Sequence, residues 1–495
     1  MMRAIHSLVL GYLFAFTDAF LLRNVASSPH HATARYASSN SASSSALTTS
    51  LNVTIVGAGP AGLLLAHRLL EGGASVNIYE KRARPVLGTL LPGRAYALGI
   101  GRRGRTALQQ APNVWEAVRQ AGFPSDRFRL HAGPVALKLR DSAGQQEPSL
   151  LCFQSDLCAA LLKELEQQYS TDRLTIQFNV PVTNINFKDR TCQTKNGELV
   201  AFDLIVGCDG VNSVVREAMQ KEWPAFKVTQ RELPGKFKTV QLPNVPSDKL
   251  DPTAVSLVMP QKGSTTAFVE PVSDSGRCCV LFAGSNSSDP LLVSSDATEI
   301  EQVLQERYPS FRPEALTSAA EQLANIPKAS QASSVQCNIY HYNDVAVLCG
   351  DAAHATGGVS GQGVNSALTD SVVLAECIHQ STSMREALNA YSMKQVPEGH
   401  ALYDLSFPPP PSSKLEALGR TLGTLRDFIF RGRFGIGKLP IQVQLTTSLE
   451  SFADIRRARM DGFPSQSEWE RKLSTLDASA VASLSARGKE TTSTK

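Results

Sequence analysis

The sequence predicts an α/β protein in which a helix-covered parallel sheet is interleaved with an antiparallel sheet and followed by a C-terminal helical segment. Three observations predict this fold class. An apolar strand beginning near residue 51 runs into a glycine-rich turn and a helix. Two later apolar strands, within 202–210 and 344–351, each end beside a glycine and an aspartate. Between them, residues 254–282 contain three short β-rich runs separated by turn residues.

The composition indicates a chain that buries a core. Its 495 residues are 42 % hydrophobic and 19 % charged, which excludes a wholly disordered or fibrous protein. A net charge of +4 gives no electrostatic case for binding nucleic acid. The nine cysteines include no CxxC pair, so we expect neither a disulfide framework nor a metal site.

The first fifty residues have the composition of a targeting segment. Residues 1–22 carry Arg3 and then an interrupted apolar run, as in the core of a signal peptide. Residues 23–50 are rich in serine, contain no acidic residue and are expected to be disordered, as in a transit peptide. With the Ala19-Phe20 junction, they resemble the two-part plastid presequence of algae with secondary plastids. We therefore expect a plastid location, with secretory membranes, a mitochondrion or an uncleaved N-terminal anchor as alternatives.

Residues 51–80 predict one dinucleotide site. An apolar strand, the sequence Gly57-Ala-Gly-Pro-Ala-Gly62, a helix and a second strand follow one another. Gly57 permits the tight turn, Gly59 lets the backbone approach a pyrophosphate, and Gly62 lets the helix pack closely. The helix N-terminus supplies positive charge. The second strand ends at Glu80, whose carboxylate can accept hydrogen bonds from the ribose hydroxyls of an adenosine.

A second match to this glycine spacing, from Gly99 to Gly104, is not expected to bind a dinucleotide. No β-rich apolar strand is predicted before it, and no acidic residue follows at the required distance. The chain is therefore expected to contain one Rossmann-like dinucleotide unit.

Two further turns place an aspartate near the end of an apolar strand. Asp209 precedes Gly210 after the first strand, and Asp351 follows Gly350 after the second. A helix is predicted over 364–378, shortly after the second turn. Because ligands bind at the carboxyl ends of strands in doubly wound sheets, both aspartates are candidate ligand-binding residues.

These elements predict the domain organisation. We expect a core over 51–406, with the nucleotide-binding part mainly in 51–90, 151–216 and 336–400, and the substrate sheet mainly in 91–150 and 217–335. Antiparallel strands are predicted at 254–259, 265–270 and 277–282. A proline-rich stretch, 407–413, leads into a helical segment, 414–474, and a disordered tail, 475–495. No apolar run there is long enough for a C-terminal membrane anchor.

The motifs, in this order and spacing, resemble the group A flavoprotein aromatic hydroxylases, which share the fold of p-hydroxybenzoate hydroxylase. Within that group the chain is most similar to the kynurenine 3-monooxygenases. The resemblance covers roughly residues 51–460, and its matching stretches are 93–104, 203–210, 350–355, 361–365 and 396–406.

This resemblance implies that the chain binds FAD and assigns residues to it. Gly57–Gly62 and Glu80 would hold the adenosine diphosphate half, and Asp351 would hold the ribityl chain. Asp209 would lie where the flavin and the nicotinamide cofactor pass each other. The dipole of the 364–378 helix would stabilise negative charge on the flavin pyrimidine. The expected cofactor-binding residues are Gly57, Ala58, Gly59, Pro60, Ala61, Gly62, Glu80, Lys81, Arg94, Arg103, Gln154, Asp209, Gly210, Arg216, Gly350, Asp351, Gly361, Gln362, Gly363, Val364 and Asn365.

The resemblance also implies an activity. NAD(P)H, with NADPH favoured, would reduce the flavin, and O2 would add to it as a C4a-hydroperoxide that hydroxylates a small aromatic substrate. Two other functions stay open. One is a plastid flavoenzyme of the same fold that acts on isoprenoids, either an epoxidase or a prenyl reductase. The other is a flavin-binding protein without turnover. The oligomeric state is left open.

The chain departs from the family pattern near the cofactor. Gln154 stands where the family usually has an arginine near the pyrophosphate. The stretch 357–360, which includes Gly358, lacks the proline expected before Gly361. His354 has two interpretations, a core histidine, which is favoured, or a catalytic base.

A second departure concerns the substrate. The kynurenine enzymes clamp a carboxylate with an arginine, a tyrosine and an asparagine. Asn365 matches the asparagine, whereas Phe128 occupies the arginine position and 132–153 contain no tyrosine. Because Arg127 and Arg129 share one face of a predicted strand, opposite Phe128, we expect one of them to complete the clamp with Asn365.

Overall fold

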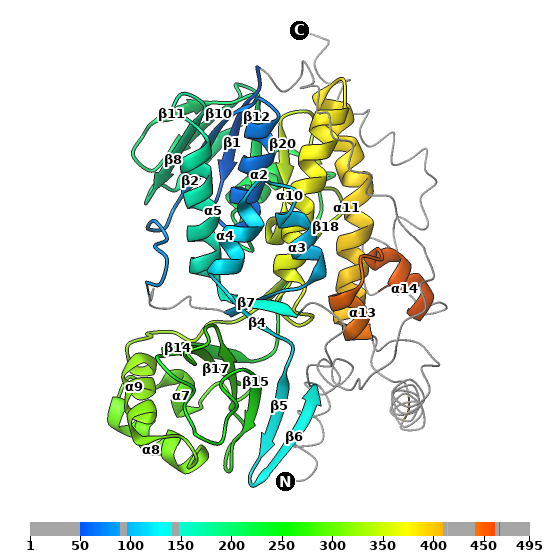
Figure 1. The fold of residues 1–495 in the computed structure, drawn as a ribbon. Coiled ribbons are helices and arrows are strands. Elements are labelled where there is room, and N and C mark those ends of the chain that lie inside the picture. The colour runs from blue at the N-terminus through cyan, green and yellow to red at the C-terminus, as the bar shows by residue number, and fades with distance from the viewer. Residues whose placement is uncertain are drawn as a thin grey trace.

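The computed structural model describes residues 50–89, 97–140, 148–408, 413, 441–460 and 465, and the predicted presequence and tail lie outside these ranges. A six-stranded sheet organises the part of the molecule drawn at the top of Figure 1. Its neighbouring strands pair in parallel except for one antiparallel edge pair. In spatial order the strands are β19 (His341–Tyr342), β20 (Ala346–Leu348), β12 (Leu204–Gly207), β1 (Asn52–Val56), β2 (Ser75–Glu80) and β8 (Leu174–Phe178).

Helices pack on this sheet and bury most of the apolar core. The predicted first helix is α2 (Pro60–Glu71), in which Leu63 to Leu65 are fully buried. The predicted helix after the second Gly-Asp turn is α10 (Gly363–Gln380), which packs against α2 and contributes Leu368 and Leu374 to the same core. Other helices of this part are α5 (Gln154–Gln168), α6 (Val214–Glu222) and α11 (Met384–Ser406).

The second large sheet is antiparallel apart from one pair and lies at the bottom of Figure 1. Its order is β14 (Lys236–Leu242), β17 (Cys278–Gly284), β16 (Thr266–Pro271), β15 (Val255–Met259), β5 (Phe128–Ala132) and β6 (Val135–Arg140). The three predicted antiparallel strands are β15, β16 and β17, with the expected pairing. One face of this sheet is covered by α7 (Pro290–Val293), α8 (Ala297–Arg307) and α9 (Pro313–Ala324), which bury Ile300, Leu304 and Leu323 against it.

Three smaller sheets complete the architecture. The one made of β3 (Ala97–Ile100), β7 (Ser149–Phe153) and β4 (Phe123–Ser125) lies between the two large sheets (Figure 1). A second contains β9 (Val182–Asn186), β10 (Thr191–Thr194) and β11 (Leu199–Ala201). The third contains β13 (Val228–Glu232), β18 (Ser333–Cys337) and β21 (His354–Thr356).

Two expectations need correction around residue 100. A strand, β3, does precede the second glycine motif, although it pairs antiparallel with β7 and therefore starts no parallel βαβ unit. The helices after it, α3 (Arg102–Leu108) and α4 (Val114–Gln120), were expected with the substrate sheet. Instead they bury Leu108 and Val118 in the core of the parallel sheet, because α3 packs against α10.

The described part of the C-terminal segment is helical. It consists of α13 (Ile441–Thr447) and α14 (Phe452–Met460), and the rest of the predicted segment lies outside the described residues. Phe452 and Ile455 pack against Leu402 and Leu405 of α11. Glu398 of α11 accepts hydrogen bonds from the first backbone amides of α14, at 2.7 and 3.1 Å, so that its carboxylate sits at the positive end of this helix.

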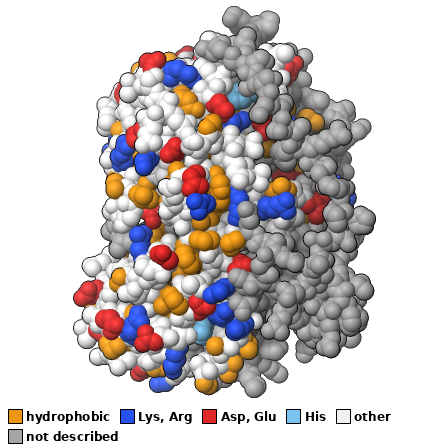
Figure 2. Space-filling model, in the orientation of Figure 1, with side chains coloured by type: hydrophobic (Ala, Val, Ile, Leu, Met, Phe, Trp, Pro, Cys, Tyr) orange, Lys and Arg blue, Asp and Glu red, His pale blue; other side chains and the backbone are white. Residues whose placement is uncertain are grey.

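The surface and the thiols add three observations. All nine cysteines are buried and none forms a disulfide. On the face shown in Figure 2, basic and acidic side chains are interspersed rather than gathered into a patch of one sign. Within the described ranges, no helix combines the length and the apolar character needed to cross a membrane.

Candidate functional site

The turn between β1 and α2 is tightly packed at Gly57 and Gly62, and it leaves open space at Gly59. Gly57 has a φ of +106°, and a Cβ on it would lie 2.5 Å from the carbonyl oxygen of Cys208. A Cβ on Gly62 would lie 2.1 Å from the carbonyl oxygen of Gly57. A Cβ on Gly59, by contrast, would meet nothing nearer than 4.0 Å. The first and third glycines therefore hold the turn, while the space in front of α2 beside Gly59 is open to a ligand.

Glu80 fixes the same turn from the end of β2. Its Oε2 accepts a hydrogen bond from the Ala58 backbone N–H at 2.8 Å, and its Oε1 accepts one from the Arg82 N–H at 2.9 Å. The side chain is largely buried, whereas the adjacent Lys81 is exposed. A buried carboxylate beside a helix N-terminus is the arrangement that recognises the adenosine end of a dinucleotide.

A second turn brings an aspartate between two helix N-termini. Gly350 opens the short 3-10 helix η2 (Gly350–Ala352) with a φ of +63°. A Cβ on it would lie 2.9 Å from the Cβ of Ala367 on α10 and 3.6 Å from that of Ala61 on α2. Asp351 is exposed, and its Oδ1 lies near Gly363 at the start of α10. Desolvation by the surrounding protein raises the pKa of this carboxyl group.

A buried histidine–aspartate pair holds this turn in place. The Oδ2 of Asp370 accepts hydrogen bonds from the Gly350 backbone N–H at 3.0 Å and from the His354 Nε2 at 2.6 Å. His354 is buried, and its ring stacks on Tyr340 with centroids 5.5 Å apart. Burial lowers the pKa of His354, but the charge and hydrogen bond of Asp370 raise it to a net value above normal. These contacts support the core-histidine interpretation.

Asp209 and Arg216 meet at the end of β12. The Asp209 Oδ2 accepts a hydrogen bond from the Val214 N–H at 2.6 Å, whereas its buried Oδ1 has no partner among the described residues. Desolvation raises the pKa of Asp209. Arg216, expected to contact the cofactor, donates to the Ala352 carbonyl and to Gln230 Oε1, both at 2.9 Å. Arg216 therefore stabilises η2 through the Ala352 carbonyl and does not point at the open turn. Asp209 retains one carboxylate oxygen that can accept a hydrogen bond from a ligand.

Asn365, expected at the substrate, holds the second glycine motif. Its Oδ1 accepts a hydrogen bond from the Gly101 N–H at 2.8 Å, and its Nδ2 donates to the carbonyls of Gly99 at 3.0 Å and Gly361 at 3.3 Å. A Cβ on Gly104 would lie 2.5 Å from that Oδ1. Gly104 is therefore explained by close approach to α10, a reason that the motif spacing alone does not reveal.

The structure does not join the two arginines to Asn365. Arg127 and Arg129 both pair with Asp251, at 3.7 and 3.6 Å. As expected, Phe128 points to the other face of the sheet, where it packs with Leu151 and other apolar side chains. The contacts described here do not support the proposed carboxylate clamp, which stays a prediction.

The remaining predicted residues lie apart from this turn or outside the described ranges. Arg94 falls in the undescribed stretch 90–96. Arg103 is buried, donates to the Glu450 carbonyl and lies 4.2 Å from the ring centroid of Phe452, so it contacts the C-terminal segment. Gln154 begins α5 and is half-buried. Gly210 has a φ of +76° with open space around it, and Gly361, Gln362 and Val364 lead into or begin α10.

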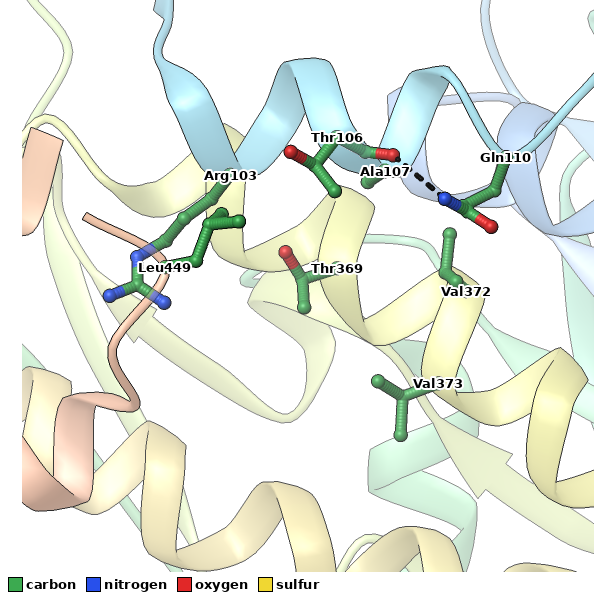
Figure 3. A pocket seen from close by; sticks show the side chains of 8 residues that line it. All are labelled: Arg103, Thr106, Ala107, Gln110, Thr369, Val372, Val373 and Leu449. Atoms are coloured by element: carbon green, nitrogen blue, oxygen red, sulfur yellow. Dashed lines mark hydrogen bonds between the residues drawn. The ribbon is translucent and has the colours of Figure 1, made fainter. Parts of the chain in front are cut away.

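A pocket of about 40 Å³ lies between α3 and α10 (Figure 3). Its lining is Arg103, Thr106, Ala107, Gln110, Thr369, Val372, Val373 and Leu449. This volume holds about three water molecules and no aromatic ring or nucleotide. We therefore place the ligand site at the two glycine turns and not in this pocket.

Comparison with known proteins identifies the family of the chain. Residues 50–406 match the family model described as "FAD binding domain". The chain belongs to this FAD-binding family. Kynurenine 3-monooxygenase from Salinispora tropica is 28 % identical over 363 residues, covering 72 % of this chain and 78 % of that protein. The resemblance predicted from the motifs is therefore confirmed.

Solved structures show the same fold. The tetrameric form of 2-methyl-3-hydroxypyridine-5-carboxylic acid oxygenase superposes with a TM-score of 0.61 at 19 % identity, covering 80 % of this chain and 96 % of that one. PqsL from P. aeruginosa in complex with 2-aminobenzoylacetate gives 0.57 at 18 %, covering 76 % and 100 %. The α/β fold class predicted for this FAD-binding chain is confirmed.

The residues present fit FAD. Gly59 leaves open the space that a pyrophosphate needs, at the positive end of α2. Glu80 lies beside the N-terminus of α2, where the resemblance places the adenosine end, and the exposed Asp351 lies where it places the ribityl chain. The N-terminus of α10 lies beside Asp351, where it can face the flavin ring.

Proposed function

We propose that this protein is an FAD-dependent monooxygenase that uses NAD(P)H and O2 to hydroxylate a small aromatic substrate, with a substrate similar to kynurenine. The observation that carries the proposal is the convergence of two helix N-termini, Glu80 and Asp351 on one site in a chain of the FAD-binding family. The names of the relatives support oxygenation of an aromatic compound. None of these names supports an isoprenoid substrate, and we do not pursue that alternative.

In this proposal the residues of the chain bind FAD, stabilise charge on it and exclude water from the substrate. Bound FAD would supply the redox chemistry, accepting electrons from NAD(P)H and activating O2. Glu80 and the α2 N-terminus hold the adenosine diphosphate end, and Asp351 holds the ribityl end. The positive end of α10 stabilises negative charge that develops beside it, by about 0.3–1 kcal/mol. The apolar cluster of Phe128, Leu151 and Phe268 excludes water from the substrate side.

Turnover tests the proposal directly. The full chain is loaded with FAD and mixed with NADPH or NADH under isotopically labelled O2, with and without kynurenine. We expect the substrate to accelerate flavin reduction, the product to carry one labelled oxygen atom, and NADPH to be preferred. A protein that binds FAD but whose reduction rate no aromatic compound changes would refute the proposed hydroxylation. That outcome would favour the alternative without turnover, to which the departures at Gln154 and Gly358 point.

We also propose a plastid location, on the strength of the signal-like and transit-like parts of residues 1–50. A fluorescent protein fused behind these residues is expected to enter the plastid of an alga with a secondary plastid. Retention of the fusion in the secretory membranes, or import into mitochondria, would refute this location.

A further inference from the structure

Three side chains form a row across the antiparallel sheet. Gln241 on β14 pairs directly with Cys279 on β17, and Cys279 pairs directly with Glu270 on β16. Side chains that are paired in this way have Cβ atoms roughly 5 Å apart. Gln241 and Glu270 therefore lie on one face of the sheet, about 10 Å from each other, with the small Cys279 thiol between them.

This face, which we term the inner face, is the one turned toward the parallel sheet. Successive side chains alternate between faces, so Glu270 shares its face with Phe268 and not with Val269. Val269 packs on the opposite face beneath α8 and α9. Phe268 contacts Phe128, with ring centroids 5.8 Å apart, and this cluster includes Leu151 of β7.

The strands that cover the inner face lead to the cofactor site. Cys279 packs with Phe153 at the end of β7 and with Ala97 at the start of β3. The chain after β3 docks through Gly101 on Asn365, in the first turn of α10. Figure 1 shows β7 and β4 between the antiparallel sheet and the helices of the parallel sheet. The row therefore lies on the side of the antiparallel sheet from which the FAD site is reached.

The side-chain amide of Gln241 and the carboxyl group of Glu270 have no hydrogen-bond partner among the described residues. Gln241 is 5 % exposed, and both its Oε1 and its Nε2 are buried without a hydrogen bond. Glu270 is partly exposed, and no hydrogen bond or ion pair to it occurs in the described part of the chain. Burial alone raises its pKa to about 8. Buried polar groups are normally paired, so an unpaired amide and an unpaired carboxyl group in one row indicate a ligand.

The distribution of charged side chains between the two faces of the antiparallel sheet restricts the charge of that ligand. Two cationic side chains of this sheet point the other way: Arg129 pairs with Asp251, and the Lys238 Nζ donates to the Leu323 carbonyl on α9 at 2.8 Å. Arg277, just before β17, lies on the inner side over the Phe153 ring, where Asp156 pairs with it at 3.1 Å. The inner face thus presents a carboxyl group to its ligand. An ionised Glu270 would repel a carboxylate ligand. An ammonium group would instead donate hydrogen bonds to the Glu270 carboxylate and stabilise its ionised form.

We propose that the row Gln241–Cys279–Glu270 recognises the substrate, that Glu270 accepts hydrogen bonds from an ammonium group, and that the substrate class is therefore an aromatic compound with an alkylamine side chain and not a simple aryl acid. This inference rests on the proposed function, because it identifies the substrate of that same site. The Gln241 amide, a donor and an acceptor in one group, binds a second polar substituent on the ring.

Binding to the FAD-loaded full chain tests this assignment without turnover. The probes are benzylamine, which is cationic, benzyl alcohol, which is neutral, and benzoate, which is anionic, each titrated by calorimetry. We expect benzylamine to bind at least tenfold more tightly than benzoate, and Glu270→Gln to weaken benzylamine by about 10- to 100-fold. Glu270→Gln should leave benzyl alcohol within about twofold. The matched control Glu232→Gln, on an exposed strand position, should leave all three unchanged.

Proton release supplies a readout that a structural role would not change. At pH 7 a carboxyl group with a pKa of about 8 is roughly 90 % protonated, so an ammonium ligand that ionises it releases close to one proton. The neighbouring Cys279 thiol, whose pKa burial raises well above normal, stays protonated. Arg277, which lies over the Phe153 ring, is paired with Asp156 at 3.1 Å. Calorimetry in two buffers of different ionisation enthalpy measures the release, which Glu270→Gln should abolish.

Each outcome decides the inference separately from the proposed function. Tighter binding of benzoate than of benzylamine, or undiminished proton release in Glu270→Gln, would overturn it even if the protein hydroxylates some other aromatic compound. The expected binding pattern would support it even if turnover is absent. Gln241→Leu replaces an unpaired buried amide by an apolar group, so it should hold or raise the melting temperature of the free protein. A clear fall in that melting temperature would show that Gln241 stabilises the fold, and would exclude it from the proposed substrate-binding row.

Discussion

Replacing Asp351 by alanine should separate FAD binding from folding. The exposed carboxylate lies between the N-termini of α2 and α10 and is the group expected to hold the ribityl hydroxyls. A hydrogen bond to a charged group contributes about 1.5–3 kcal/mol. Because each 1.4 kcal/mol is a factor of ten, Asp351→Ala should weaken FAD by about 10- to 140-fold.

The same substitution should not destabilise the FAD-free protein. The pKa of Asp351 is raised in the folded chain above its usual 3.8, so ionisation of this group lowers the free energy of unfolding, and this cost develops as the pH rises from about 3.8 through the raised pKa. At neutral pH the ionised carboxylate therefore opposes folding. Asp351→Ala should hold or raise the free energy of unfolding at pH 7, and the difference from the parent chain should vanish below about pH 3.8.

Two measurements check both halves of this prediction. FAD is titrated into the FAD-free chain and its fluorescence quenching gives the Kd, and urea unfolding without FAD gives the stability. Asp274→Ala, at an exposed turn of the antiparallel sheet, is the control. An unchanged Kd for Asp351→Ala would show that the ribityl contact is misplaced. A loss of stability equal to the loss of affinity would show that Asp351 supports the fold instead of the cofactor.

Three further substitutions test other parts of the site. Gly59→Leu should abolish FAD binding, because the leucine side chain would fill the open space beside residue 59. The melting temperature of the free protein should fall by only a few degrees, because the backbone of Gly59 is extended. Retained flavin absorbance would contradict this prediction. Asp370→Asn should lower stability by about 3–5 kcal/mol in urea unfolding. Since the pKa of His354 is raised, the pair contributes fully below pH 6.5 and its contribution should fade as the pH rises through the raised pKa; a pH-independent difference would refute the ion pair. Arg129→Ala should lower stability by about 1 kcal/mol and leave the KM of an arylalkylamine substrate unchanged, whereas a KM for an acidic substrate raised more than tenfold would restore the carboxylate clamp.

The cofactor turn could be predicted because its causes are local. The strand, the glycine turn, α2 and Glu80 lie within about thirty residues, and the steric reason for Gly62 is the Gly57 carbonyl of the same turn. Only the close approach of Gly57 to Cys208 involves a distant segment. The same holds for β15, β16 and β17, whose alternation and turns are visible in the sequence.

The rest could not be predicted because it depends on distant segments. Gly104 makes room for Asn365, which is more than 260 residues away along the chain, so the glycine spacing of 99–104 arises without a nucleotide turn. Arg103 likewise finds its partners in the C-terminal segment. Strand periodicity placed Arg129 opposite Phe128, but it could not reveal which face turns toward FAD. The packing of Leu151 and Phe153 shows which face turns toward the parallel sheet, and Glu270 shares that face.

The burial of every thiol matters for an enzyme that handles oxygen. A flavin oxygenase whose cycle fails to reach its substrate releases hydrogen peroxide, and peroxide attacks thiolates before protonated thiols. All nine cysteines of this chain are buried, and burial raises the pKa of those such as Cys152 and Cys158 far above neutrality. Every thiol is therefore shielded from peroxide, and burial also keeps thiols such as Cys152 and Cys158 in the protonated form, which peroxide attacks more slowly than the thiolate.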